Sequence, residues 1–230
     1  LAEASHFRVT LADALGTMRL KWERHGEFSG YTLHVEGLAD APFDAPAAQQ
    51  LPAGWLAAIP GRTVAAVHAE VTAADAAAPD AGALAQRFGG HMVVGAEIAE
   101  GAGTLFTDFR VHADGCSRLW LISRRLTLAQ TGRMLQRLFE IEAYRVLALL
   151  ALPIARRQGP RIAAIEDALA ALTDQMAREG ANDEALLHEL MRLAAEVESG
   201  IAASQFRFGA CEAYHGLVQR RIAELRESRL

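Results

Sequence analysis

Cysteine and basic charge are both scarce in this sequence. Cys116 and Cys211 are its two cysteines, and neither belongs to a CxxC pair, so there is no disulfide framework and no paired-cysteine metal motif. Acidic residues outnumber basic ones by 28 to 23, which gives a net charge of −5. A general nucleic-acid binder carries a basic surface. We therefore expect no nucleic-acid partner, and we expect both cysteines to act as small apolar core residues.

Long apolar runs are also missing. The strongest apolar segment, residues 146–155, is ten residues long, contains Pro153 and is followed by Arg156 and Arg157. A membrane-spanning helix needs about 20 apolar residues. We therefore predict that this segment is a buried core helix.

Sequence motifs of catalytic and cofactor sites are absent as well. There is no GxGxxG, no GxxxxGK[ST] and no GxSxG. Several histidines fall on predicted strands, but they lack HxH or HExxH spacing; they are His25, His34, His68, His91 and His112. We therefore expect no metal and no cofactor, and we assign no catalytic residue.

The first half of the chain has the alternation that is typical of strands. "MRLKWERHG" and "FSGYTLHVEG" alternate around a Gly-Glu turn. Four further strand-like segments follow: "RTVAAVHAEV", "HMVVGAEIAE", "GTLFTDFRVHA" and "CSRLWLISRRL". We predict an α+β domain over residues 1–158, with a mainly antiparallel sheet of about six strands, short helices and a first long helix from about residue 127.

The second half of the chain is predicted to be helical. Thr127 is placed to cap a helix that runs to about Arg157, and Pro160 to begin a second helix that runs to about Arg178. Asn182 or Asp183 caps a third helix of roughly 65–70 Å. Apolar residues step by three and four, so residues 159–230 are predicted to form a long helical hairpin of coiled-coil character.

The third helix has no Gly, Asn or Pro to stop it at the end of the sequence, which predicts a chain truncated at its C-terminus. A helix of this length is only partly covered by its shorter neighbour. Phe208, Val218, Ile222 and Leu225 continue its apolar stripe. Because exposed apolar stripes are rare in monomers, we expect a homo-oligomer through this C-terminal helix.

Charged residues cluster in three parts of the sequence. In a regular strand Asp108, Arg110 and His112 face one side, away from Phe109 and Val111. If the apolar side faces the core, the charged side faces solvent or a polar groove. The candidate cluster comprises Glu23, Arg24, His25, Asp108, Arg110, Arg118, Arg137, Glu140, Glu142, Tyr144 and Arg145. It is either a structural charge network, a ligand or ion site, or a catalytic site.

Five segments together resemble an uncharacterised bacterial family described as predicted membrane-anchored proteins, domain of unknown function 3422. They are "LKWERHGEFSGYT", "LPAGWLAAIPG", "TDFRVHADGCSR", "QTGRMLQRLFEIEAYRVLALLALPIAR" and "RFGACEAYHGLVQRRIAELRE". The resemblance implies more helix downstream and a hydrophobic anchor near the C-terminus. It also marks Cys116 as a departure, because an aromatic residue is expected there.

The resemblance implies a soluble part of an inner-membrane-anchored protein, with its soluble domain in the cytoplasm and membrane contact only through a segment outside this chain. We expect a non-enzymatic assembly, scaffold or signalling module. One alternative is a regulatory domain of an oligomeric ion transporter, because long helices before a membrane segment resemble CorA-type magnesium channels. Another is an enzyme that uses Glu23, Asp108 and Glu142.

Overall fold

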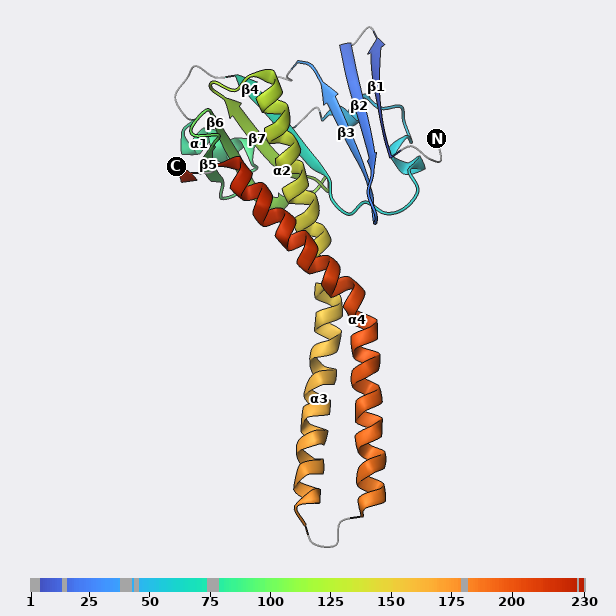
Figure 1. Cartoon of the computed structure of the whole chain (residues 1–230). Coiled ribbons are helices and arrows are strands. Elements are labelled where there is room, and N and C mark those ends of the chain that lie inside the picture. The colour runs from blue at the N-terminus through green and yellow to red at the C-terminus, as the bar shows by residue number, and fades with distance from the viewer. Residues whose placement is uncertain are drawn as a thin grey trace. The chain divides into compact units, whose positions relative to one another are not determined.

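The computed structural model describes residues 5–13, 16–37, 43, 46–73, 79–178, 182–226 and 228–229. The chain has the predicted α+β character and forms two compact units, Leu1–Leu126 with Ser228–Leu230, and Thr127–Glu227 (Figure 1). The boundary lies before the first long helix. The structure therefore groups that helix with the other long helices, whereas the sequence assigned it to the α+β domain.

The first unit contains two sheets where the sequence predicted one. The smaller sheet has the order β1-β2-β3 and is antiparallel throughout. Its strands are β1 (His6–Asp13), which was not predicted, β2 (Gly16–Arg24) and β3 (Ser29–Val35). Met18 and Leu20 of β2 are buried. Short 3-10 turns follow, η1 (Ala47–Gln50) and η2 (Leu56–Ala58).

The larger sheet has the order β4-β7-β6-β5-β8. Its strands are β4 (Val67–Ala73), β5 (Val94–Ile98), β6 (Gly103–Val111), β7 (Ser117–Ser123) and β8 (Ser228–Arg229). β4 pairs with β7 in parallel, and the other pairs are antiparallel. Helix α1 (Ala81–Arg87) connects β4 to β5 and is capped by Asp80, whose carboxylate accepts the Ala83 N–H at 2.7 Å.

An aromatic cluster forms the core beside this sheet. Phe43, Phe88, Phe106 and Trp120 are buried together with Ile122. The indole N–H of Trp120 donates to Thr72 Oγ1 at 3.0 Å. This bond satisfies the one polar atom of the Trp120 side chain and links β7 to the parallel strand β4.

The second unit consists of α2 (Leu128–Leu149), α3 (Leu152–Met176) and α4 (Asp183–Leu225). The predicted caps are present. Thr127 and Gln130 form a capping box, and Asn182 accepts the Ala185 N–H at 3.2 Å. These residues satisfy backbone N–H groups that a helix start leaves without intrahelical partners.

The helix break between α2 and α3 lies earlier than the sequence predicted. α2 ends at Leu149 and α3 begins at Leu152, so Pro160 lies inside α3. Pro153 lies in the first turn of α3, where a missing N–H costs nothing. The predicted buried segment therefore spans a junction between two helices. Only part of it is buried: Leu147 is 4% exposed, while Leu149 is 51% exposed.

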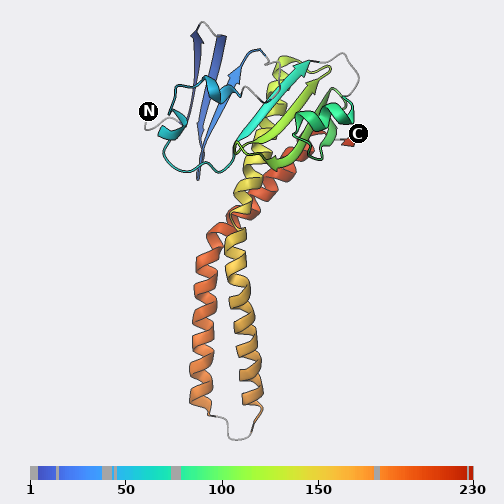
Figure 2. The ribbon, with the colours of Figure 1, turned by 180° about the vertical axis from the view of Figure 1, so that it is seen from behind.

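α4 runs beside α3 and then beside α2 in the opposite direction, as Figures 1 and 2 both show. It is bent part-way along. Ser204 Oγ donates to the Gly200 carbonyl at 2.8 Å, and Gln158 Nε2 of α3 donates to the same carbonyl at 3.4 Å. A serine bonded to the carbonyl four residues earlier favours a bend in its helix.

We predict that Leu147→Ala destabilises the helical unit by about 2–5 kcal/mol, because it leaves a cavity in α2. Leu149→Ala is the matched control, two residues away and exposed, and should change stability by no more than about 0.5 kcal/mol. Urea unfolding followed by far-ultraviolet circular dichroism measures both. Equal losses for the two variants would contradict the burial pattern.

Candidate functional site

The turn between β6 and β7 brings six side chains with metal-binding or acid–base capacity into two groups. An open hollow lies beside this turn, lined by Gly89, His91, Arg110, Val111, His112, Ala113, Asp114 and Arg118. The two groups are defined here as the histidine–aspartate cluster, His91 with Asp108 and His112, and the cysteine cluster, His68 with Asp114 and Cys116.

The histidine–aspartate cluster is centred on one carboxylate oxygen. Asp108 Oδ2 lies 3.0 Å from Nδ1 of His91 and 2.8 Å from Nε2 of His112. The Asp108 side chain is 0% exposed, compared with 9% for His112 and 35% for His91. The buried carboxylate therefore has an imidazole on two sides, and both imidazoles border the hollow.

An irregular strand makes this contact possible. Four residues of regular strand span about 13 Å, so Asp108 and His112 would not touch along a straight β6. The pairing of β6 with β7 shifts register between Thr107 and Val111, and Phe109 has φ 53°. This bulge bends the strand, which then pairs with β7 again at Val111. His91 follows Gly89 and Gly90, whose φ values of 66° and 83° suit glycine.

The bulge also overturns one sequence expectation. The alternation of a regular strand predicted that Phe109 and Val111 face the core and that Asp108 faces solvent or a polar groove. Phe109 and Val111 are instead 56% and 65% exposed, and Asp108 is buried. Since the left-handed residue changes the direction of the strand, the alternation does not continue past Thr107.

The Asp108 carboxyl is held in its charged form. Burial by itself raises the pKa of Asp108. The hydrogen bond from the Arg110 backbone N–H and the contacts with His91 and His112 lower it by more, so the net pKa of Asp108 is below its usual range. The Arg110 N–H donates to the second oxygen, Oδ1, at 3.2 Å. Both carboxylate oxygens are therefore fixed in direction.

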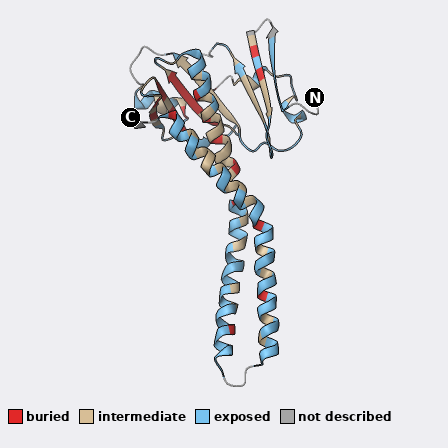
Figure 3. Ribbon diagram, in the orientation of Figure 1, coloured by how far each residue is buried: buried red, intermediate tan, exposed pale blue. Residues whose placement is uncertain are grey.

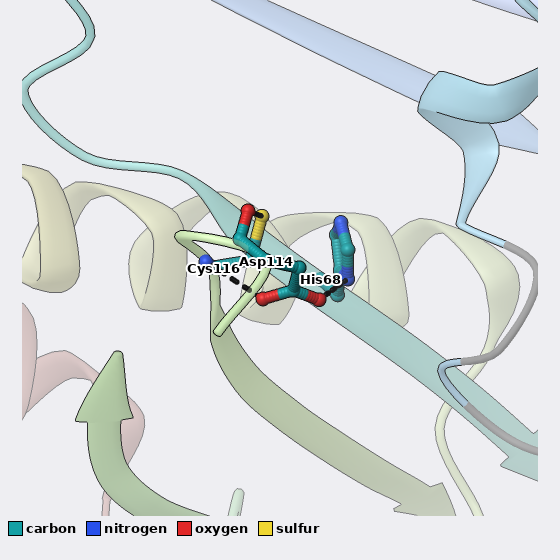
Figure 4. Close-up of side chains that lie close together, drawn as sticks. All are labelled: His68, Asp114 and Cys116. Carbon is teal, nitrogen blue, oxygen red and sulfur yellow. Dashed lines mark hydrogen bonds and ion pairs between the residues drawn. The ribbon is translucent and has the colours of Figure 1, made fainter. Parts of the chain in front are cut away.

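The cysteine cluster joins Asp114 and Cys116 of the same turn to His68 of β4 (Figure 4). Asp114 Oδ1 accepts the Cys116 N–H at 3.0 Å, and Asp114 Oδ2 lies 3.6 Å from His68 Nδ1 and 3.8 Å from Arg118. The hydrogen bond from the Cys116 backbone lowers the pKa of Asp114 despite a small opposing effect of burial. Asp114 is thus an anion between a histidine and an arginine.

The thiol of Cys116 is not activated. Burial raises the pKa of Cys116, the nearby Asp114 carboxylate raises it further, and Arg118 only partly opposes them. A nucleophilic cysteine needs the opposite shift, since the thiolate is the reactive form. The grouping of Cys116, His68 and Asp114 therefore does not favour cysteine catalysis.

Comparison with known proteins gives a family. The family model described as "Protein of unknown function (DUF3422)" matches residues 2–230. The chain belongs to this family. No curated protein and no solved structure matches the DUF3422 chain.

Family membership leaves the anchoring prediction open. In the part of the chain that the structure describes, no helix combines the length and the apolar character needed to cross a membrane. Cys116 is half-buried in the cysteine cluster, and Cys211 is half-buried on α4.

The predicted charged cluster is distributed among several local contacts. In the first unit, Glu23 pairs with Lys21 at 2.8 Å, His25 stacks on Phe28 at 4.2 Å, and Arg24 ends β2. Asp108, Arg110 and Arg118 gather at the β6–β7 turn. The structure therefore brings these last three together and gives Glu23 and His25 other neighbours.

In the second unit the predicted residues tie helices to each other. Glu140 pairs with Arg221, and Arg137 with Glu224 at 2.7 Å, so two ion pairs link α2 to α4. The bond with Glu140 raises the pKa of Arg221. Glu142 and Arg145 pair within α2 at 2.7 Å, and Tyr144 stacks on Tyr214 at 5.6 Å.

Sequence reasoning missed the histidine–aspartate cluster. The histidines were noted, but motif spacing gave no reason to join His91 to His112. Two signals were present: a Gly-Gly pair directly before His91, and a His four residues after an Asp. Neither is specific, because the contact depends on the bulge at Phe109.

His68 predicts a pH dependence of stability. Burial lowers its pKa from the usual 6.5, Asp114 opposes the shift, and Arg118 and His112 add to it. The unfolded chain therefore binds a proton at His68 more readily than the folded chain does, and stability contributed by neutral His68 is lost as pH falls below about 6.5.

We predict that the first unit of His68→Gln loses less stability than wild type between pH 7.5 and pH 5. Urea unfolding followed by tryptophan fluorescence measures this, because Trp22, Trp55 and Trp120 all lie in that unit. His188→Gln, on an exposed part of α4, is the control and should keep the wild-type slope. A His68→Gln slope equal to wild type would refute the assignment.

Proposed function

We propose that this DUF3422 chain is a non-enzymatic assembly module that pairs with a second copy of itself through one apolar face of α3 and α4. The observation that carries the proposal is a set of exposed, regularly spaced apolar side chains on these two helices. The membrane anchor implied by the family resemblance would lie outside these residues, and a transporter-regulating role is an alternative that the helical contacts do not favour over simple self-assembly.

The stripe on α3 repeats every seven residues. Ile162, Leu169 and Met176 are 53%, 46% and 58% exposed. Ile165 and Leu172, which the sequence placed in the same seam, are instead half-buried and buried. α3 therefore uses one apolar line within the unit and leaves a second, parallel line in solvent. Most of the α3 ribbon is exposed (Figure 3).

The stripe on α4 advances in steps of three, four and seven. Its exposed members are Leu187 at 59%, Leu190 at 37%, Val197 at 41%, Ile201 at 51% and Phe208 at 39%. The sequence placed the interface further along, from Phe208 to Leu225. There Leu225 is buried and Val218 half-buried, because α2 lies beside that part of α4.

The two stripes lie on the same side of the helix pair. Arg161 of α3 and Glu196 of α4 approach to 3.9 Å across the antiparallel helices, so both lie along one side of the contact between the helices. Ile162 and Val197 are the next residues in the sequence, and each is rotated by about 100° around its helix, which places both on the opposite side of that contact. Leu169 and Leu190 are seven residues from Ile162 and Val197, so they lie on the same side as those two residues. One continuous apolar face results.

A second copy fits this face in size. α3 has 25 residues, hence a length of about 37 Å, and two helices side by side are about 20 Å wide. The face is thus about 700 Å² per copy, close to the ~800 Å² that each partner contributes to a stable interface.

A second copy also fits the chemistry. Small or apolar residues lie among the stripe positions, including Ala155, Gly159, Thr173 and Ala194, while Glu166 on α3 and Asp183 at the start of α4 carry charge. A mainly apolar face offers little electrostatic selection for a charged partner. The same apolar surface on a second copy suits it, as in a twofold dimer.

We predict that wild type sediments as a dimer at micromolar concentration and that Ile162→Asp with Val197→Asp sediments as a monomer. Burying two unpaired carboxylates costs several kcal/mol, so the dissociation constant should rise by more than about a hundredfold. Sedimentation velocity decides this, with circular dichroism to confirm that the helices remain.

The matched control is Ala164→Asp with Ala171→Asp, which places the same charges on the opposite, exposed side of α3. This variant should remain dimeric. A wild-type monomer, or equal dissociation of the two double variants, would rule out the proposed face.

A further inference from the structure

The histidine–aspartate cluster has no part in self-assembly and carries an independent inference. We propose that His91, Asp108 and His112 bind one divalent transition-metal ion of the zinc type. Two imidazoles and one carboxylate form a donor set that suits zinc and other borderline divalent ions and leaves coordination positions open.

The three donor atoms already converge on one point. His91 Nδ1 and His112 Nε2 lie 3.0 Å and 2.8 Å from the same oxygen of Asp108, and all three atoms lie within 4.8 Å of one another. Ligand atoms at about 2.0–2.2 Å from a tetrahedral ion lie roughly 3.3 Å apart. Binding therefore needs each histidine to move outward by only a few tenths of an ångström.

The surrounding backbone holds the donors in place. The Arg110 N–H fixes Asp108 through Oδ1 at 3.2 Å, which leaves Oδ2 for the ion; such supporting bonds are typical of metal ligands. Phe109 pays a conformational cost at φ 53°, and non-glycine residues in this region cluster at functional sites. The bulge brings Asp108 and His112 together, which a regular strand would not do.

The ion would be reached from the hollow. His91 and His112 line it, whereas the Asp108 side chain is fully buried behind them. Arg110 and Arg118 also line the hollow, so their positive charges favour an ion whose open position holds an anionic ligand or hydroxide. Water or an anion can therefore complete the coordination from the solvent side.

The cysteine cluster is the weaker candidate. Asp114 Oδ1 is occupied by the Cys116 N–H, and Arg118 lies 3.8 Å from Oδ2. The Cys116 Sγ lies 3.8 Å from the Asp114 carbonyl oxygen as a donor. An ion there would have to displace an arginine and deprotonate the thiol, so this cluster serves as the internal control.

The test uses the full chain, stripped with a chelator, and Zn²⁺ alone. Bound zinc after dialysis is counted by mass spectrometry, and affinity is measured by competition with a chromophoric chelator. Wild type should retain about one ion. His91→Gln and His112→Gln should each weaken binding by at least about a hundredfold, since even outer-shell changes cost 10–100-fold.

Two controls and a spectrum keep the result decisive. His34→Gln, a strand histidine outside both clusters, and Cys116→Ser should bind zinc as wild type does. Co²⁺ in place of Zn²⁺ should show d–d bands without a sulfur-to-cobalt charge-transfer band. No retained ion, equal binding by His91→Gln and wild type, or a charge-transfer band lost in Cys116→Ser would each overturn the assignment.

Discussion

The chain leaves the five-stranded sheet after β7 and returns to it at β8. The three long helices form the connection between these two strands. α4 has 43 residues, whereas α2 and α3 have 22 and 25, so at about 1.5 Å per residue one helix is nearly as long as the other two end to end. One long helix therefore packs against two shorter ones in succession.

The part of α4 beside α2 is held by the ion pairs of Glu140 and Arg137 and by the Tyr144–Tyr214 stack. The part beside α3 is held by the Gln158–Gly200 hydrogen bond, the Arg161–Glu196 pair and buried apolar residues such as Leu172 and Leu193. A helix pair buries only one side of each helix. The exposed stripes on α3 and α4 follow from this arrangement, and they are the basis of the proposed self-assembly.

A buried charge organises the β6–β7 turn in a similar way. An unpaired carboxylate in a protein interior is costly, so burial of Asp108 requires donors on both of its oxygens. The bulge at Phe109 supplies the Arg110 N–H and His112, and the Gly89–Gly90 turn supplies His91. Local backbone irregularity thus produces a polar cluster at one end of β6. The same constraint explains why the cluster has the composition of a metal site although no metal motif is present in the sequence.

Features that depend on near neighbours in the sequence were predictable. The Thr127 and Asn182 caps, the helical hairpin and most strands follow from residue type and spacing. Features that depend on tertiary contacts were not. The division into two sheets and the parallel pairing of β4 with β7 have no local signal, and Pro160 was a misleading helix start because Pro153 occupies the first turn of α3. The charged cluster was predicted as one group for two reasons: strand alternation was extended through the bulge at Phe109, and charged residues at helical spacing were taken as one face. In the structure its members have several separate local partners.

The most direct test of the central claim, that the apolar face of α3 and α4 joins two copies, is pulsed electron paramagnetic resonance on singly labelled protein. In a Cys116→Ser, Cys211→Ser background, a spin label is attached at Glu166→Cys, beside the apolar face, or at Ala171→Cys, on the opposite side of α3. The account predicts a dipolar coupling between copies at both positions. The distance at residue 166 should be shorter by about two helix diameters, ~20 Å, because the label moves by about one diameter in each copy. Absence of coupling between copies, or a shorter distance at residue 171, would contradict it.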